Sequence, residues 1–224
     1  MNNPWDAFGI ELDHLVVAAA SLEEGSQWLQ ERLGVPLQPG GRHAGWGTHN
    51  RLLQLGAGTY LELIAPDPEQ PAPIGARPFG LDSPELRALL AERPRLVHFV
   101  VRTARLQDAA NAIGYDPGPV MRMSRGALSW QITVPTDGRP AGGGLLPTLI
   151  QWDVDIEALH PSRVLNASGV RLVELRITLP GDLRLLLSGL ERDPRVRLAS
   201  PGEDGARIGL SASLSTPLGR VRID

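Results

Sequence analysis

The most constraining feature of this chain is an internal repeat of a strand-like hexapeptide. Residues 12–17 read Leu-Asp-His-Leu-Val-Val and residues 96–101 read Leu-Val-His-Phe-Val-Val, so a histidine stands third in both copies. In each copy a leucine, Leu22 or Leu106, follows the histidine eight residues later and begins a helix-like segment. A repeat of this kind indicates that two equivalent structural units build one fold.

Each histidine-bearing strand is followed by a segment with helix signals. Residues 21–33 begin at Ser21, which suits a helix N-cap, and end before Gly34, which suits a left-handed C-terminal cap. Residues 105–113 end before Gly114 in the same way. Three strand candidates follow each helix, at residues 43–48, 51–55 and 59–65 and at residues 120–124, 127–134 and 146–154. The sequence therefore predicts two βαβββ modules.

The remaining segments divide into a linker and a tail. We assign residues 1–66 to the first module, 67–95 to a Pro-rich linker with a short helix, and 96–155 to the second module. Residues 156–224 repeat the βαβββ order without the histidine, and we interpret them as a degenerate third module with a structural role. The predicted fold class is α+β. The modules form one compact unit, a curved mixed sheet shaped as a cup with helices on its outer face.

Four polar residues stand inside the otherwise apolar strands. Strand alternation predicts that His14 shares a face with Leu12, and the same rule orients Glu62, His98 and Gln151. An ionisable group on a buried strand is costly unless it meets a partner. Two-fold symmetry between the modules would bring two histidines and a carboxylate together in the cup. Such a set suits a divalent metal, with Zn²⁺, Ni²⁺, Mn²⁺ and Fe²⁺ as the candidates.

The sequence resembles the vicinal-oxygen-chelate superfamily, and more closely its glyoxalase-like branch of longer bacterial proteins. The resemblance covers about residues 10–180. It is carried by residues 12–17 and 96–99 in the repeat, and by Gly-Trp-Gly-Thr-His-Asn at 45–50, Thr-Tyr-Leu-Glu-Leu-Ile-Ala-Pro-Asp-Pro at 59–68 and Pro-Thr-Leu-Ile-Gln-Trp-Asp at 147–153.

This resemblance implies roles for four side chains. It makes His14, Glu62 and His98 the metal ligands, one at the start of each module and one at the end of the first. The fourth position usually holds a carboxylate, and here it is Gln151. A neutral amide cannot act as a general base, so we expect Gln151 to line the pocket and bind the substrate, and we leave the catalytic base unassigned.

The segment Thr48, His49 and Asn50 offers three side chains with donors and acceptors as it enters a strand that should line the cup. We predict that it binds substrate, although turn capping is the alternative. Other simpler interpretations also stay open. The two motif histidines could be structural, and Glu62 could pair with Arg51. His43 is expected in a solvated loop and His160 at a structural turn, while Trp46, Trp130 and Trp152 are expected in the core, with Trp152 under a helix.

Composition narrows the classes of function. The formal net charge is −3 and no basic stripe is present, so nucleic acid is not an expected partner. The apolar stretches are too short to span a bilayer, and the first ten residues lack the pattern of a signal peptide. No cysteine is present, which leaves His, Glu, Asp and Gln as metal ligands. We expect a cytoplasmic protein.

The leading functional hypothesis is a metal-dependent lyase, isomerase or dioxygenase acting on a small molecule with neighbouring oxygens. The alternative is a metal-free protein of the same fold that binds or sequesters a small molecule. A third hypothesis makes the repeated sheet only a scaffold for dimerisation, and a homodimer is compatible with all three.

Overall fold

The computed structural model describes residues 3–56, 58–153 and 155–224, without the side chains of residues 156, 157 and 204. The first module holds β1 (Glu11–Ala18), α2 (Leu22–Leu33), β2 (Gln38–His43), β3 (Thr48–Gln54) and β4 (Tyr60–Pro66). The second holds β5 (Arg95–Arg102), α4 (Leu106–Ala112), β6 (Val120–Arg125), β7 (Leu128–Thr133) and β8 (Thr148–Trp152). Both have the predicted βαβββ order.

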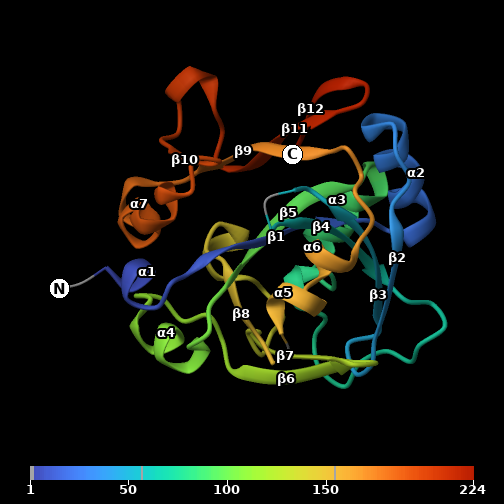
Figure 1. Cartoon of the computed structure of the whole chain (residues 1–224), viewed down its shortest axis with the longest axis horizontal. Helices are drawn as coiled ribbons and strands as arrows, with labels where there is room; N and C mark the ends of the chain where they lie inside the picture. The colour runs from blue at the N-terminus through green and yellow to red at the C-terminus, as the bar shows by residue number, and fades with distance from the viewer. Residues whose placement is uncertain (1–2, 57, 154) are drawn as a thin grey trace.

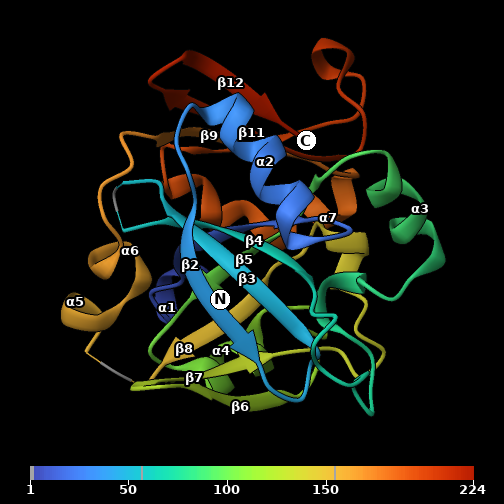
Figure 2. The same cartoon turned by 90° about the vertical axis from the view of Figure 1, so that its right-hand side faces the viewer.

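The strands of the two modules form one eight-stranded sheet with the order β2-β3-β4-β1-β5-β8-β7-β6. The sheet curves until it is nearly closed, and its edge strands β2 and β6 lie next to each other (Figures 1 and 2). The predicted α+β fold with a curved sheet is therefore confirmed.

A two-fold relation between the modules is visible in the register of the central strands. In the antiparallel pair β1 and β5, His14 lies opposite Val100 and Val16 lies opposite His98. These two pairs exchange when one module is laid on the other. The pseudo-two-fold axis therefore passes between the two histidine-bearing strands, as the repeat predicts.

Local signals in the sequence fix helix α2. The Ser21 hydroxyl accepts a hydrogen bond from the backbone N–H of Glu24, and Gly34 closes the helix with a φ of 72°. The first strand after this helix is β2, which begins five residues before the predicted strand at residues 43–48. Gly45 and Gly47 have φ values of 87° and 58°, so residues 44–47 form the turn of a hairpin instead.

The two faces of the large sheet contact different layers. The outer face packs against α2, α4 and the C-terminal sheet in one apolar cluster, which includes Leu15, Leu63, Phe99 and Leu175. The inner face, inside the cup, carries a second cluster, which includes Val16, Tyr60, Trp130 and Trp152. The cup interior therefore has its own side chains, separate from the main core.

The tail has the predicted order of elements but a different pairing. It contains β9 (Arg171–Thr178), α7 (Gly181–Leu187), a 3₁₀ helix η3 (Ser188–Arg192), β10 (Val196–Ala199), β11 (Gly209–Thr216) and β12 (Gly219–Ile223). These strands form a separate sheet with the order β10-β9-β11-β12. Here β9 pairs in parallel with the strand that follows its helix, whereas β1 pairs in parallel with the last strand of its module.

Several short helices connect these parts. They are α1 (Pro4–Ala7), η1 (Pro78–Gly80), α3 (Pro84–Glu92), η2 (Ala141–Gly144), α5 (Ile156–Leu159), α6 (Pro161–Val164) and η4 (Glu203–Gly205). The segment with α5 and α6 crosses beside the cup on its way to the second sheet (Figure 1). In the part of the chain that is described, no helix has the length and apolar character needed to cross a membrane.

Candidate functional site

A bulge in β1 turns two consecutive polar residues toward the inside of the cup. The register between β1 and β5 shifts between Leu12 and His14, so Asp13 has no residue opposite it. Leu12 consequently belongs to the outer cluster with Leu15, and the expectation that it shares the face of His14 is wrong. Simple alternation fails because the extra residue of a bulge reverses the parity of the strand.

Asp13 is the buried anchor of the site. Its carboxylate accepts hydrogen bonds from His14 Nδ1 at 2.6 Å, His160 Nε2 at 2.9 Å and Trp152 Nε1 at 3.1 Å. Burial alone would raise the pKa of Asp13, but the hydrogen bonds from His14 and His160 outweigh it and hold the pKa well below its ordinary value. Asp13 is therefore a carboxylate at neutral pH, and it fixes a proton on His14 Nδ1.

This arrangement directs the other nitrogen of His14 at Glu62. The His14 ring stacks on Tyr60, with centroids 4.6 Å apart, and its Nε2 lies 3.6 Å from Glu62 Oε2. That separation is too long for a direct hydrogen bond. A ligand atom that reaches this point would contact both groups.

Asn50 holds Glu62 in place from the neighbouring strand. Its side-chain amide donates to Glu62 Oε1 at 2.6 Å and to His43 Nε2 at 3.3 Å. Its carbonyl oxygen accepts from the backbone N–H of Gly41 at 2.7 Å and from Arg125 Nη1 at 3.2 Å. All hydrogen-bonding positions of this side chain are thus in use, which fixes both its orientation and the carboxylate of Glu62.

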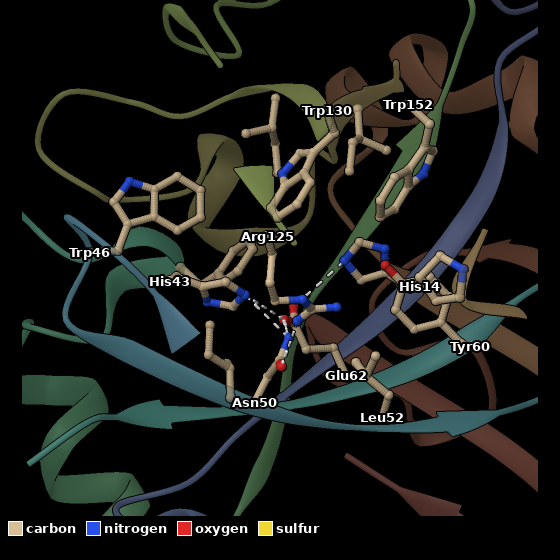
Figure 3. Close-up of a pocket in the computed structure, with 15 residues that line it drawn as sticks. His14, His43, Trp46, Asn50, Leu52, Tyr60, Glu62, Arg125, Trp130 and Trp152 are labelled. Carbon is tan, nitrogen blue, oxygen red and sulfur yellow. Dashed lines mark hydrogen bonds and ion pairs between the residues drawn. The ribbon is translucent and has the colours of Figure 1, made fainter. Parts of the chain in front are cut away.

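His43 and Arg125 complete the polar group. His43 is buried and its Nδ1 lies 3.0 Å from Thr48 Oγ1. Burial lowers the pKa of His43, while the charge of Glu62 raises it and that of Arg125 lowers it. Arg125 reaches across from β6, so the two modules meet at this point (Figure 3).

The floor of a cavity inside the cup is formed by His14, His43, Asn50, Glu62 and Arg125. Its walls are mainly aromatic and aliphatic. The aromatic residues on the walls are Trp46, Tyr60, Phe79, Trp130 and Trp152. In Figure 3 the rings of Trp130 and Trp152 stand on one side of the polar group and Trp46 on another. A concave, largely apolar cavity with a few converging polar groups is typical of a small-molecule site.

His98 lies outside this cavity. Its Nδ1 donates to the carbonyl oxygen of Gly144 at 3.0 Å, and its Nε2 accepts from the backbone N–H of Thr148 at 3.1 Å and lies 3.0 Å from Thr148 Oγ1. Phe79, which does line the cavity, packs against the His98 ring with centroids 5.3 Å apart. Complete burial lowers the pKa of His98 to about 4, so the ring is neutral at pH 7.

The predicted metal ligands are therefore only partly assembled. His14 and Glu62 face each other, whereas both ring nitrogens of His98 are occupied by other groups. Among the described residues, no three His, Asp or Glu side chains are arranged to hold a metal ion. The donor set in this conformation does not fit a three-ligand metal centre.

Gln151 lies on the opposite side of the sheet from the cavity. Its Oε1 accepts a hydrogen bond from the backbone N–H of Leu106 at 3.0 Å, which caps the N-terminus of α4. The register identifies a different residue as the counterpart of Glu62. Val16 pairs with Glu62 and its equivalent Val100 pairs with Thr148, so Thr148 occupies the fourth position of the two-fold arrangement.

The three residues of the predicted substrate-binding segment, Thr48, His49 and Asn50, alternate between the two faces of β3. Asn50 lines the cavity, and Thr48 contacts His43 behind it. His49 points to the other side, where its Nδ1 lies 3.8 Å from Asp67 Oδ1. Its buried Nε2 has no hydrogen-bond partner among the described residues. Of the three, Asn50 is the residue in direct contact with the candidate site.

Several residues of the site differ from the positions that the sequence predicts, or carry no signal in the sequence. Asp13 could have been found, because two adjacent polar residues in an apolar strand signal a bulge. His43 is buried rather than solvated, and Trp152 lines the cavity rather than packing under a helix. His160 does lie at a structural turn, where it also bonds to Asp13. No local signal pointed to Arg125, which reaches the site only through the closure of the sheet.

Comparisons with known proteins agree with this architecture. The model of the glyoxalase-like domain family matches residues 12–185. Among curated proteins, none matches the chain. A hypothetical protein from Staphylococcus aureus has a similar structure, with a TM-score of 0.55 and 13% identity over 96% of this chain and 86% of that one.

Two methylmalonyl-CoA epimerases are more distant. The Mycobacterium tuberculosis enzyme has a TM-score of 0.39 and 21% identity over 63% of this chain and 86% of that one. A variant of the Streptomyces coelicolor enzyme, in complex with 2-nitronate-propionyl-CoA, has a TM-score of 0.42 and 19% identity over 64% of this chain and 98% of that one. These likenesses are too low to carry a substrate over to this chain. The family match covers most of the sequence and agrees with the paired βαβββ modules, so the chain belongs to the glyoxalase-like domain family of the vicinal-oxygen-chelate fold.

Proposed function

We propose that this protein is an isomerase- or lyase-type enzyme that moves a proton on a small molecule held in the cup. The observation that carries the proposal is the contact chain from Asp13 through His14 to Glu62, at 2.6 Å and 3.6 Å. Asp13 keeps the proton of His14 on Nδ1, which leaves the lone pair of Nε2 facing the cavity. A base oriented in this way by a buried carboxylate is a recurring catalytic arrangement.

The proposed step is proton abstraction from a carbon next to a carbonyl group. The proton moves from this carbon to His14 Nε2, and the electron pair of the C–H bond moves onto the carbonyl oxygen to give an enolate. Asp13 stabilises the imidazolium that forms, and the guanidinium of Arg125 stabilises negative charge on the substrate oxygens. Return of the proton to either face, or to a neighbouring atom through Glu62, gives an isomerised product.

Hydrogen exchange with solvent tests this proposal without a known substrate. A panel of 2-oxo acids and 2-hydroxyketones, which have neighbouring oxygens, is incubated in D₂O and followed by NMR against protein-free samples. We expect protein-dependent deuterium incorporation that falls about 10²–10⁴-fold in the His14→Ala and Glu62→Gln variants. The control is Arg122→Met, because Arg122 lies on the same strand as Arg125 but its side chain is 73% exposed and forms an ion pair with Asp153.

The same assay addresses the role of a metal. In the described conformation only His14 and Glu62 of the predicted ligands converge, so we expect exchange to persist in EDTA. Exchange that appears only after addition of Zn²⁺, Ni²⁺, Mn²⁺ or Fe²⁺, and is lost in His98→Ala, would instead support the predicted ligand set of His14, Glu62 and His98.

Light scattering on the same samples tests the predicted homodimer.

A metal-free binding or sequestering protein is the second candidate. The aromatic walls favour it, because Trp130 and Trp152 approach each other to 5.6 Å between ring centroids at one side of the cavity. Tight binding of panel compounds with no exchange under any metal condition would establish this function and reject the enzyme.

A further inference from the structure

The aromatic residues of this chain are concentrated in one place. The sequence has 5 Trp, 2 Tyr and 3 Phe, and half of these side chains line the cavity above His14 and Glu62. Three of them are tryptophans, of which Trp130 and Trp152 lie side by side with an interplanar angle of 45°. Large flat rings around a cavity give favourable contact area to a flat, conjugated ligand, and aromatic pairs gain energy beyond the area they bury.

Arg125 is the cation of this cavity, and most of its donors are unused. A guanidinium carries five N–H donors, and within the described residues one of them, on Nη1, bonds to Asn50 Oδ1 at 3.2 Å. None of the described carboxylates forms an ion pair with Arg125, in contrast to Arg42, Arg77 and Arg102. In Figure 3 the side chain of Arg125 ends among the polar groups of the floor.

The position of Glu62 explains why Arg125 stays free for a ligand. The Oε1 atom of Glu62 accepts from Asn50 at 2.6 Å and its Oε2 faces His14. Asn50 therefore stands between the carboxylate and the guanidinium and bonds to both. A carboxylate matches the fork of a guanidinium with two parallel hydrogen bonds, which makes an anionic group the best complement to the free donors.

We propose that the substrate class of this site is an aromatic carboxylate, with the ring between the tryptophan walls and the carboxylate on Arg125. This inference rests on the proposed function, since it specifies the substrate of the same cup. The cup is concave and lined mainly by aromatic and aliphatic side chains, with Arg125 as its cation. A carboxylate on Arg125 would lie close to Glu62, because Asn50 bonds to both Arg125 and Glu62.

Isothermal titration calorimetry with three matched probes tests the proposal. The probes are 2-naphthoate, its saturated counterpart decahydronaphthalene-2-carboxylate, and the neutral 2-naphthamide. We expect 2-naphthoate to bind most tightly, with the saturated acid at least about fivefold weaker because it cannot stack. The amide should be about ten- to a hundredfold weaker because it lacks the charge-assisted hydrogen bonds.

Two variants locate the binding energy. Arg125→Met should weaken 2-naphthoate binding about ten- to a hundredfold and leave 2-naphthamide unchanged, whereas the control Arg122→Met should change neither. Equal affinity of the saturated and aromatic acids, or an unchanged affinity for 2-naphthoate in Arg125→Met, would overturn the proposal. The probe series on the unmodified protein decides the question even if Arg125→Met fails to fold.

The binding experiment and the exchange experiment test different claims, so either claim can be rejected while the other is kept. The probe 2-naphthoate has no hydrogen on the carbon next to its carboxylate, so its binding does not depend on proton transfer. Selective binding of 2-naphthoate without exchange of any panel compound would keep this substrate class and reject the enzymatic function. Exchange of pyruvate without any preference for phenylpyruvate would keep the enzyme and reject the aromatic class.

Discussion

Replacement of Asp13 by asparagine tests how far the site depends on one buried carboxylate. Asp13 accepts three hydrogen bonds, from His14, Trp152 and His160, with its two oxygens. Asparagine has the same shape but one oxygen and one NH₂ group. In either orientation of the amide, its NH₂ group faces a nitrogen that carries a proton in the unmodified protein. This nitrogen is His14 Nδ1 in one orientation, and Trp152 Nε1 or His160 Nε2 in the other.

The magnitude follows from these contacts. A hydrogen bond to a charged group contributes about 1.5–3 kcal/mol, and leaving a buried donor unpaired costs about 1–3 kcal/mol. We therefore expect Asp13→Asn to lower the free energy of unfolding by about 3 kcal/mol at pH 7. If the NH₂ group faces His14, the proton of this ring moves to Nε2, and the lone pair that faces the cavity is lost.

Two measurements check this prediction. Urea unfolding gives the loss of stability, and ¹⁵N–¹H NMR of the histidine rings shows which nitrogen of His14 carries the proton. The control is Asp153→Asn, whose side chain bonds to Gln131 and pairs with the exposed Arg122, and which should change the free energy of unfolding by less than about 0.5 kcal/mol. A loss below about 1 kcal/mol together with an unchanged tautomer of His14 would refute the reasoning.

The pH dependence of this effect has a defined sign. The folded-state pKa of Asp13 lies below its ordinary value of 3.8, so the folded state binds fewer protons than the unfolded state in the acidic range. The stabilisation is complete above about pH 4 and is lost as the pH falls through the folded-state value. The difference between Asp13→Asn and the unmodified protein should therefore be constant from pH 5 to 7 and shrink only in strong acid.

Three further predictions concern His98, Gly40 and Gln151. The folded-state pKa of His98 is about 4, against an ordinary value of 6.5. Acidification from pH 6.5 to 4 should therefore lower the free energy of unfolding, measured in urea, by about 3 kcal/mol. His98→Gln should remove this pH dependence. A Cβ on Gly40 would lie 2.0 Å from Asn50 Oδ1, so Gly40→Ala should displace Asn50 and reduce deuterium exchange at least tenfold, while Gly75→Ala, in open space, should not. Gln151→Ala should lower the free energy of unfolding by about 1 kcal/mol, because α4 loses its cap. The affinity for 2-naphthoate should not change. A tenfold change in this affinity would instead support the predicted role of Gln151 in substrate binding.

The fold was predictable because its signals are local and repeated. The two His-containing hexapeptides, the cap at Ser21 and the stop at Gly34 each depend on a few neighbouring residues, and the structure confirms all of them. The pairing in the tail was not predictable, because the order of its elements is compatible with more than one arrangement of strands.

The site was only partly predictable, because one irregularity in a strand changes which face of the sheet the side chains beyond it occupy. The bulge at Asp13 reverses the parity before His14, and the choice of Gln151 in place of Thr148 rests on an assumed correspondence at the end of the second module. His14 was found through the repeated hexapeptide, and Glu62 because it is the only charged residue in an apolar strand. Arg125 lies at the end of an edge strand, and only the curvature of the whole sheet brings it to Asn50.

The meeting of the sheet edges has a consequence for how a ligand reaches the cup. The strands β2 and β6 are the two ends of the described sheet and share no ladder of backbone hydrogen bonds, although they touch. Near this seam, Arg125 of β6 donates a hydrogen bond to the side chain of Asn50 in β3. Parting the seam costs a few side-chain contacts, whereas parting any other pair of strands would break a ladder. The seam between β2 and β6 is therefore the line along which we expect the described sheet to separate at the lowest cost, and an anion on Arg125 would lie beside it.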